Sequence, residues 1–249
     1  MTRQIVLITG ALTGIGRATA FAYAKTGAGI VVSGRSDSNG RLLEAQLREA
    51  GADAQFVRAD VREEDQVRAL VERTLEKFGR LDVAVNNAGT EGELAPIPEQ
   101  TVENFRRTFD TNVLGTLLSL KYELPVMSAQ KSGSIINISS IAAKVGFANA
   151  PMYAASKHAI DGLTKSAALE VAHLGVRVNS VAPGPVQTDM MERFVGRDGD
   201  VRQGFVKSVP ALRVGTADEI ADAIVFLGSD RAAFFNGQSV VIDGGYLAR

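Results

Sequence analysis

Apolar and polar positions follow two alternating patterns along the chain, short β-rich runs and longer stretches of helical composition. The β-rich runs predict strands near residues 4–9, 29–34, 54–59, 81–86, 133–139, 175–181 and 238–242. Helices are predicted between them, at about residues 15–27, 38–50, 63–78, 99–129, 151–173 and 216–228. Runs such as Ile135-Ile136-Asn137-Ile138 are apolar on both faces, as expected of strands that lie between two helix layers.

The repeated order of strand and helix predicts the fold class. Strand–helix–strand units with right-handed crossovers build a parallel sheet that has helices on both faces. No linker rich in Pro, Gly or Ser and no low-complexity tract divides the chain. We therefore expect a single α/β domain over residues 1–249, a Rossmann-type, doubly wound parallel sheet of about seven strands.

Composition excludes several classes of function. Of the 249 residues 45% are hydrophobic, and the net charge of −1 gives no broad field that would attract nucleic acid or anionic lipid. The chain has no cysteine, so disulfides and thiolate ligands are excluded. His158 and His173 have no ligand partners at useful spacing, and we expect both on helix surfaces, with no metal site.

The apolar segments are short. The run from Ile5 to Ile8 ends at Thr9 and is too short for the core of a signal peptide. No later segment approaches the length that spans a membrane. These features predict a cytoplasmic enzyme with a small-molecule substrate and with neither nucleic acid nor membrane as a partner.

The loop after the first predicted strand carries a dinucleotide-binding pattern. Gly10 allows a tight turn, Gly14 lets the backbone approach a pyrophosphate, and Gly16 lets helix and strand pack closely. Thr13 and Ile15 lie in the same loop, and the helix start would face the phosphates with free N–H groups. An ordinary glycine-rich turn is the alternative, which the position between first strand and first helix disfavours.

Two further strand ends extend the predicted cofactor site. Asp60 and Val61 close the third strand, where a carboxylate could accept a hydrogen bond from the adenine amino group. Asn87, Ala88 and Gly89 follow the fourth strand, and small residues there leave room for adenosine and ribose. Each segment taken alone could equally be a turn.

The end of the second strand bears on the choice between NAD and NADP. An acidic residue there would bind both ribose hydroxyls, but this chain has Ser33, Gly34, Arg35 and Ser36. Arg35 can pair with a 2′-phosphate through two hydrogen bonds, so NADP(H) is favoured over NAD(H). The alternatives are that Arg35 is a solvated residue at a helix start, and that Asp37 permits NAD.

A candidate catalytic set of three residues follows the fifth predicted strand. Tyr153 and Lys157 are four apart in a helical stretch and share a face, and Ser140 lies thirteen residues earlier. A cation about 4 Å from the phenol is worth about 4 kcal/mol at an effective dielectric of about 20, enough to lower its pKa by roughly three pH units. Tyr153 would then act as a general acid/base near pH 7, and Ser140 would hold the substrate oxygen. A strand-end cap, a packing residue and a surface charge are the alternatives, which the combination disfavours.

These motifs together resemble the short-chain dehydrogenase/reductase family over essentially the whole chain. The matching segments are Thr9-Gly-x-x-x-Gly14-x-Gly16, Asn86-Asn87-Ala88-Gly89, Ser140, Tyr153-x-x-x-Lys157 and Pro183-Gly184 followed by Thr188. The resemblance implies a hydride transfer between a nicotinamide dinucleotide and a ketone or secondary alcohol. It also implies a homotetramer.

The resemblance assigns further roles. It implies that Lys157 binds the nicotinamide ribose, and that Val186 and Thr188 bind the carboxamide, after Pro183 and Gly184. Asn112 resembles the fourth catalytic residue of the family, where it interrupts a helix and anchors a water connected to the lysine. The chain departs from the pattern at Ala143, where many members have glycine, and at the second strand end, which lacks the acidic residue of the NAD users.

The substrate side is predicted in outline. Residues 91–98, 141–149 and 188–210 should line or cover the pocket, with a lid at about 188–212 that contains Gly196 and Gly199. Apolar side chains there indicate a pocket for a ketone or secondary alcohol, or packing of lid on core: Val145, Phe147, Met190 and Phe194.

Two other functions are compatible with this scaffold. One is a redox sensor that binds the dinucleotide without catalysis, and the other is a lyase, epimerase or dehalogenase without net hydride transfer. A sensor would tend to lose Tyr153 or Lys157, and a lyase would tend to alter the glycine loop. The chain retains all of these features, so an oxidoreductase is the preferred interpretation.

Overall fold

A seven-stranded parallel sheet forms the centre of the computed structural model, which describes residues 3–195 and 199–248. The strand order is β3-β2-β1-β4-β5-β6-β7. The strands are β1 (Ile5–Thr9), β2 (Gly29–Gly34), β3 (Asp53–Arg58), β4 (Val83–Asn86), β5 (Gly133–Ile138), β6 (Val176–Pro183) and β7 (Ser239–Ile242). The order reverses between β1 and β4, which confirms the predicted doubly wound sheet and places its switch point there.

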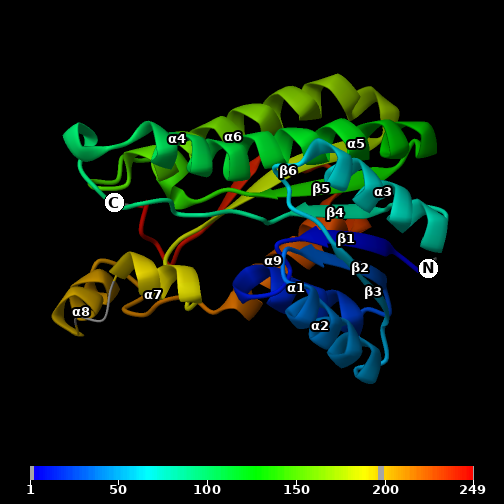
Figure 1. Ribbon diagram of the computed structural model, residues 1–249, viewed down its shortest axis with the longest axis horizontal. Coiled ribbons are helices and arrows are strands. Elements are labelled where there is room, and N and C mark those ends of the chain that lie inside the picture. Colours follow the sequence, from blue (N-terminus) through cyan, green and yellow to red (C-terminus); the bar gives the residue numbers. More distant parts are fainter. Residues whose placement is uncertain (1–2, 196–198, 249) are drawn as a thin grey trace.

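Helices cover both faces of the sheet (Figure 1). Helices α1, α2 and α9 lie on one face, and α3, α4, α5 and α6 lie on the other. The helices are α1 (Gly14–Lys25), α2 (Asp37–Glu49), α3 (Glu64–Phe78), α4 (Val102–Phe109), α5 (Gly115–Gln130), α6 (Pro151–Val171), α7 (Asp189–Val195), α8 (Gly199–Lys207) and α9 (Ala217–Gly228). Among the described residues, no helix has the length and apolar character that a bilayer span requires.

Each face of the sheet packs against its own apolar core. Successive residues of a strand point to opposite faces, so Ile136 packs with the core beneath α1 and α9, while Ile135 packs with the core beneath α3 and α5. Val6 and Leu7 of β1 divide in the same way. The two-sided apolar character that the sequence indicated for these strands is therefore confirmed.

The helix predicted over residues 99–129 is divided in two. It begins at Val102, and a wider π turn over Asp110–Leu114 separates α4 from α5. Such turns leave one residue out of the regular hydrogen-bond pattern and often occur at functional sites. One extra residue in a single turn barely changes the spacing of apolar and polar residues. The sequence pattern therefore predicted one continuous helix. The interruption falls at Asn112, where the family resemblance implied it.

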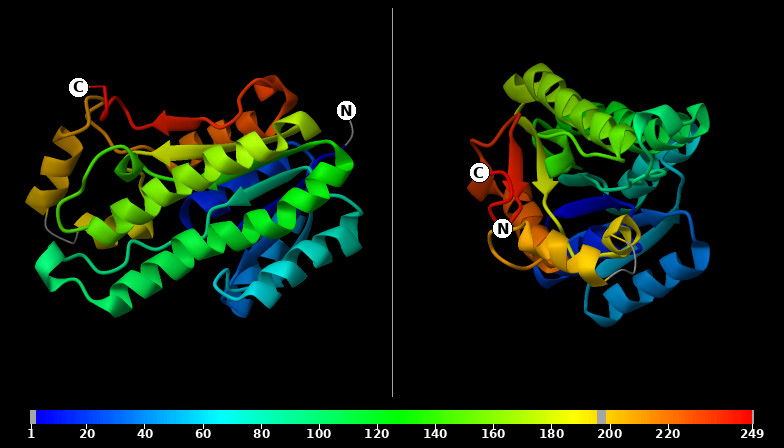
Figure 2. Two further views of the ribbon diagram at one scale, coloured as in Figure 1. Left: turned by 90° about the horizontal axis from the view of Figure 1, so that it is seen from above. Right: turned by 90° about the vertical axis from the view of Figure 1, so that its left-hand side faces the viewer.

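Helices α7 and α8 occupy the predicted lid at about residues 188–212 and lie beyond the carboxyl end of β6 (Figures 1 and 2). Gly199 begins α8, whereas Gly196 lies outside the described residues. The tail after β7 runs beside the end of this segment, where the Ala211 N–H donates to the Gly244 carbonyl at 3.0 Å. The lid segment thus contacts the sheet side through the C-terminal tail.

Candidate active site

The carboxyl ends of the central strands open into a cavity of about 510 Å³. Almost all of the predicted site residues line it. They are Gly10, Thr13, Gly14, Ile15, Arg35, Asp60, Val61, Asn87, Ala88, Gly89, Ser140, Tyr153, Lys157, Pro183, Gly184, Val186 and Thr188. The exceptions are Gly16 and Asn112, which are buried.

The glycine loop has the geometry of a phosphate cradle. Gly10 and Gly14 have φ of +61° and +52°, in the left-handed region that disfavours other residues. A Cβ on Gly16 would lie 2.5 Å from the Asn87 amide nitrogen, so only glycine permits this close packing. Thr13 forms no side-chain cap at the start of α1, so it does not occupy the first N–H groups of that helix, whose first residues line the cavity.

Asn87 fastens the glycine loop to the segment after β4. Its amide nitrogen donates to the carbonyls of Thr9 and Gly10 at 3.1 and 2.8 Å. The Thr9 hydroxyl oxygen accepts from the backbone N–H groups of Asn87 and Ala88. The shape of the glycine loop therefore depends on the hydrogen bonds of Asn87. Ala88 and Gly89, which follow Asn87, leave room in the cavity because they are small.

The end of β2 presents a cation to the cavity. Arg35 is exposed, and among the described residues its side chain has no hydrogen-bond or ion-pair partner. The buried hydroxyl of Ser33 likewise has none. Asp37, which could favour NAD, is engaged by Arg41 at 2.8 Å and points along the exposed side of α2.

Asp60 is held in place by a neighbouring arginine. Arg62 binds both oxygens of the Asp60 carboxylate, with Nη2 2.6 Å from Oδ2. This pairing lowers the pKa of Asp60, and the positive charge of Arg35 contributes in the same direction. The carboxylate is therefore ionised and oriented at the wall of the cavity that the sequence associated with adenine.

Ser140, Tyr153 and Lys157 meet at the carboxyl end of β5. The Ser140 hydroxyl oxygen accepts from the Ala142 N–H at 3.1 Å, and its side chain lies close enough to that of Tyr153 to influence the pKa of the phenol. Lys157 lies one turn after Tyr153 on α6. Its Nζ donates to the Ile138 carbonyl at 2.8 Å and lies 5.6 Å from the centroid of the Tyr153 ring. The three predicted side chains thus share one corner of the cavity.

Burial dominates the acidity of Tyr153. Removal of the phenolate from water raises the pKa of Tyr153, and the negative charge of Glu91 adds to the rise. The nearby Ser140 side chain opposes this rise and is the smaller effect. The predicted lowering of the Tyr153 pKa by Lys157 is therefore wrong for the protein's own residues. The prediction counted the attraction between the two side chains and left out the cost of desolvating the phenolate.

Burial also determines the charge of Lys157. It lowers the pKa of Lys157 to about 8, while the carboxylate of Asp161 acts to raise it. Lys157 is thus largely protonated at pH 7 and loses its proton under mildly alkaline conditions.

Asn112 connects the π turn to α6, the helix of Tyr153 and Lys157. Its amide nitrogen donates to the Thr90 carbonyl and to the Ser156 hydroxyl, each at 2.9 Å, and its oxygen accepts from the Thr90 N–H at 2.8 Å. Asn112 is completely buried. It therefore positions both the loop after β4 and the part of α6 between Tyr153 and Lys157.

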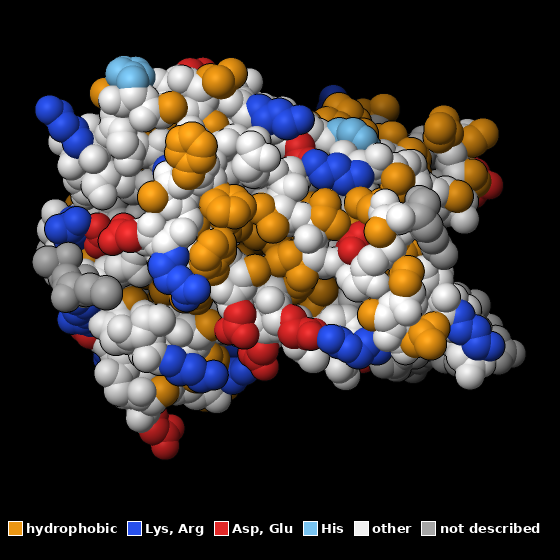
Figure 3. Space-filling view, turned by 180° about the vertical axis from the view of Figure 1, so that it is seen from behind, with side chains coloured by type: hydrophobic (Ala, Val, Ile, Leu, Met, Phe, Trp, Pro, Cys, Tyr) orange, Lys and Arg blue, Asp and Glu red, His pale blue; other side chains and the backbone are white. Residues whose placement is uncertain are grey.

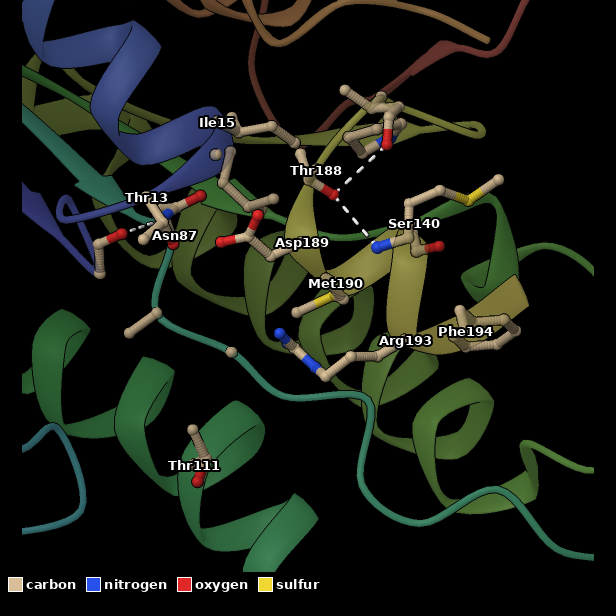
Figure 4. A pocket seen from close by; sticks show the side chains of 18 of the residues that line it. Thr13, Ile15, Asn87, Thr111, Ser140, Thr188, Asp189, Met190, Arg193 and Phe194 are labelled. Carbon is tan, nitrogen blue, oxygen red and sulfur yellow. Dashed lines mark hydrogen bonds between the residues drawn. The ribbon is translucent and has the colours of Figure 1, made fainter. Parts of the chain in front are cut away.

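The substrate end of the cavity is largely apolar. The Phe194 ring lies 5.9 Å from that of Tyr153 and 6.2 Å from that of Phe147, and Met190 extends from the same helix (Figure 4). Val145 was expected here, but it is exposed at the surface and does not line the cavity.

The ion pair at this end was not predicted, although both of its residues lie in segments expected to line or cover the pocket. Arg193 on α7 reaches into the pocket beside Met190 (Figure 4) and binds Glu91, with Nε 2.5 Å from Oε1. Glu91 is 8% exposed. The two residues are 102 positions apart, so no local spacing could have indicated the pair.

Comparison with known proteins fixes the family. The family model described as enoyl-(acyl carrier protein) reductase matches residues 10–247. The chain is 42% identical to cis-4-hydroxycyclohexanecarboxylate dehydrogenase of Sinomonas cyclohexanicum, over 98% of this chain and 97% of that protein. It is 37% identical to cyclohexanol dehydrogenase of Acinetobacter sp. (strain SE19), over 99% and 96%. The chain belongs to the short-chain dehydrogenase/reductase family.

Solved structures of the short-chain dehydrogenase/reductase family agree with the fold. The crystal structure of levodione reductase superposes with a TM-score of 0.96 at 37% identity, covering 98% of each chain. A structure of ElxO with NADP bound has a TM-score of 0.92 at 34% identity, covering all of both chains. The protein is thus an oxidoreductase of a family that binds nicotinamide dinucleotides.

His158 and His173 are both exposed on the surface, as predicted. The ring of His158 is hydrogen-bonded to the Ala154 carbonyl within α6. Within the residues that the structure describes, no three His, Cys, Asp or Glu side chains gather as metal ligands would.

Proposed function

We propose that this short-chain dehydrogenase/reductase uses NADP(H) to interconvert a ring ketone and the corresponding secondary alcohol. The proposal depends on one observation above all. The side chains of Ser140 and Tyr153 lie close together at the cavity corner where the Lys157 ammonium also lies. A carbonyl oxygen placed there would accept hydrogen bonds from both hydroxyls.

The cavity fits a dinucleotide along its length. The glycine loop with Thr13, Ile15 and the start of α1 would hold the pyrophosphate, and Asp60 and Val61 the adenine. Asn87, Ala88 and Gly89 would flank the adenosine ribose. The nicotinamide end would lie against Pro183, Gly184, Val186 and Thr188, with Tyr153 and Lys157 on its ribose. When bound, the coenzyme gives or takes the hydride.

NADP(H) is preferred over NAD(H) in this proposal. The Arg35 side chain lines the cavity at the end of β2, where a 2′-phosphate would come, and it has no hydrogen-bond or ion-pair partner among the described residues. A guanidinium matches a phosphate with two parallel hydrogen bonds. The relative ElxO, whose structure contains NADP, supports the assignment.

The proton transfer follows from the environment of Tyr153. Its raised pKa keeps the hydroxyl protonated at neutral pH, which suits donation to the substrate oxygen during ketone reduction. Ser140 would hold that oxygen while charge develops on it. The positive charge of Lys157 favours the phenolate that remains after the transfer. Asn112 would keep Lys157 in contact with solvent protons through a water at the π turn.

The substrate would be a cyclic compound. Phe147, Met190 and Phe194 give the cavity a flat, apolar lining beside Ser140 and Tyr153, suited to a carbocyclic ring. The relatives named above act, by their names, on cyclohexanol and on a hydroxycyclohexanecarboxylate. Helices α7 and α8, over about residues 188–212, would form a lid that closes on this ring.

We also propose a cytoplasmic homotetramer. Large apolar side chains lie exposed on the face of the molecule that carries β7, and hydrophobic atoms gather across it (Figure 3). Phe234 is fully exposed, Leu169 on α6 is 82% exposed, and Gly162 on the same helix has open space beside it. Exposed apolar surface of this kind is typical of a subunit interface. Sedimentation of the protein and of Phe234→Glu would test the assembly.

The decisive experiment compares the protein with Tyr153→Phe. The variant should still bind NADPH, weakened no more than about fivefold by the loss of one hydrogen bond to the ribose, but its turnover of cyclohexanone should fall about 10²–10⁴-fold. Binding is measured by the fluorescence of NADPH and turnover by its absorbance. Near-normal turnover of the variant would refute the role of Tyr153.

A further inference from the structure

A buried carboxylate lies one helical turn beyond Lys157. Asp161 on α6 is 5% exposed, and its Oδ2 lies 2.6 Å from the Nζ of Lys144. Its other oxygen accepts from the Ser180 hydroxyl at 2.8 Å, and the Ser139 hydroxyl lies near enough to contribute to its pKa. Its partners come from the loop after β5 and from the neighbouring strand β6. Asp161 is therefore fully engaged, and the surrounding bonds hold it ionised.

The Lys144–Asp161 pair joins the two segments that carry the candidate catalytic residues. Lys144 ends the short helical turn Ile141–Ala143, which Ser140 begins. Asp161 lies on α6, the helix of Tyr153 and Lys157. The pair thus ties the Ser140 turn to the helix that contains the other two residues.

The pair also places two opposite charges close to Lys157. Lys144 and Ser180, with a contribution from Ser139, keep the pKa of Asp161 below its usual value in spite of burial. Its negative charge favours the protonated form of Lys157, which burial disfavours. Lys144 is paired with the same carboxylate and partly neutralises it. The protonation of Lys157 is therefore subject to two opposing influences.

Few other charges act on this position. Among the described residues, the titratable groups that face Lys157 or its neighbours are Tyr153 and Asp161 on α6, Lys144 after β5 and Glu91 after β4. Glu91 acts on Tyr153 and is itself paired with an arginine of α7.

We propose that Asp161 and Lys144 are positioning residues that control the charge of Lys157. The Asp161 carboxylate keeps Lys157 protonated, and Lys144 limits this effect by balancing the carboxylate. The inference builds on the proposed function, in which the Lys157 ammonium binds the nicotinamide ribose and supports the Tyr153 phenolate.

The test uses two variants with opposite expected results. The affinity for NADPH should fall as pH rises through the pKa of Lys157, because the neutral amine binds ribose hydroxyls less well. Asp161→Asn should move the midpoint of this fall down by about one pH unit, because the supporting charge is lost. Lys144→Met should move it up by about half a pH unit, because Asp161 is no longer balanced. NADPH fluorescence titrations from about pH 6 to about pH 10 measure both midpoints.

A double variant adds a sharper criterion. Lys144→Met acts through Asp161, so Lys144→Met/Asp161→Asn should have the midpoint of Asp161→Asn alone. Glu76→Gln, which breaks an exposed ion pair with Arg73 on α3, is the matched control and should leave the midpoint unchanged. Midpoints that move in the same direction in both single variants, or in neither, would overturn the proposal. So would a purely structural pattern, in which affinity drops equally at all pH values.

The outcome remains decidable if a variant folds poorly. Asn at position 161 can still accept from Ser180, and thermal unfolding shows whether each variant is folded. If Asp161→Asn does not fold, Lys144→Met alone still tests the proposal. A midpoint of the NADPH affinity that moves to lower pH in that variant contradicts it. The titrations contain no substrate, so they are independent of turnover. An active Tyr153→Phe would refute the proposed function, while the binding midpoints would still decide the roles of Asp161 and Lys144.

Discussion

The Nζ of Lys157 lies 5.6 Å from the centroid of the Tyr153 ring, and it donates a hydrogen bond to the backbone carbonyl of Ile138 at 2.8 Å. The two side chains therefore share a corner of the cavity in which burial disfavours the charged form of each. Tyr153 has a raised pKa and Lys157 has a pKa of about 8. The pH dependence of the reaction should follow from these two directions.

We expect ketone reduction to decline at alkaline pH with an apparent midpoint near that of Lys157. Tyr153 stays protonated over this range because its pKa is raised, so the first group to lose its proton is Lys157. The loss weakens coenzyme binding and support of the phenolate together. The measurement is kcat/KM for cyclohexanone with NADPH as a function of pH. In Lys157→Met, the alkaline midpoint should disappear and activity should be low throughout; an unchanged midpoint would show that another group titrates.

The choice of coenzyme should depend on Arg35. Arg35→Asp replaces the cation at the end of β2 with an acid that repels a 2′-phosphate and accepts from ribose hydroxyls. The affinity for NADPH should fall about a hundredfold, while that for NADH should change by less than about threefold. Fluorescence titration with each coenzyme measures the difference.

Arg41→Asp is the matched control for Arg35→Asp, because it makes the same change of charge on α2 and Arg41 does not line the cavity. It should affect NADPH much less than Arg35→Asp does. If Arg35→Asp weakened both coenzymes equally, Arg35 would have no part in their discrimination.

The sequence predicts the strands and the glycine positions well because those features are local. A tight turn at Gly10, close packing at Gly16 and a strand apolar on both faces each follow from a few neighbouring residues. The division of the helix over residues 99–129 was not visible in the same way, because one extra residue in a turn leaves the periodicity almost intact.

Pairs between distant segments were beyond local reading. Arg193 with Glu91 and Lys144 with Asp161 each join residues that only the folded chain brings together. The acidity of Tyr153 was misjudged for a related reason. Spacing shows that a cation is near the phenol, but the degree of burial, which decides the direction here, depends on the whole fold.

A buried acid in the core should make the protein less stable as pH rises. Glu123 on α5 is 1% exposed, and burial raises its pKa to about 7, although the Asn86 amide donates to it at 3.0 Å. Below its usual value of 4.5 the carboxyl is neutral in both folded and unfolded chains. Between 4.5 and about 7 only the unfolded chain ionises, so this group removes roughly 3 kcal/mol from the free energy of unfolding over that interval.

Glu123→Gln should remove this loss. An amide stays neutral at every pH. It can also donate to the side-chain oxygen (Oδ1) of Asn86, which is buried without a partner. The variant should be more stable than the unsubstituted protein at pH 8 and nearly equal to it at pH 4.5, as measured by urea unfolding at one protein concentration. Glu170→Gln, an exposed change on α6, should show no such difference. An equal gain at both pH values would contradict the assignment to Glu123.

The ion pair between Glu91 and Arg193 should hold α7 of the proposed lid against the segment after β4. Arg193 comes from α7, and Glu91 follows β4 close enough to Tyr153 for its charge to act on the phenol. Because the Arg193 side chain is 60% exposed, its pairing contributes about 1 kcal/mol. Arg193→Met should therefore raise KM for a cyclic ketone about fivefold, and high salt should raise KM of the unsubstituted protein in the same direction.

The effect on chemistry separates a lid contact from a catalytic one. Without Arg193 the Glu91 charge is unbalanced and raises the pKa of Tyr153 further, which leaves ketone reduction intact but slows alcohol oxidation at neutral pH. Glu91→Gln/Arg193→Met removes both charges and should restore oxidation while KM stays high. Steady-state kinetics in both directions, with Arg213→Met as an exposed control, measure this. A loss of oxidation that persisted in the double variant would show that Arg193 contacts the substrate itself.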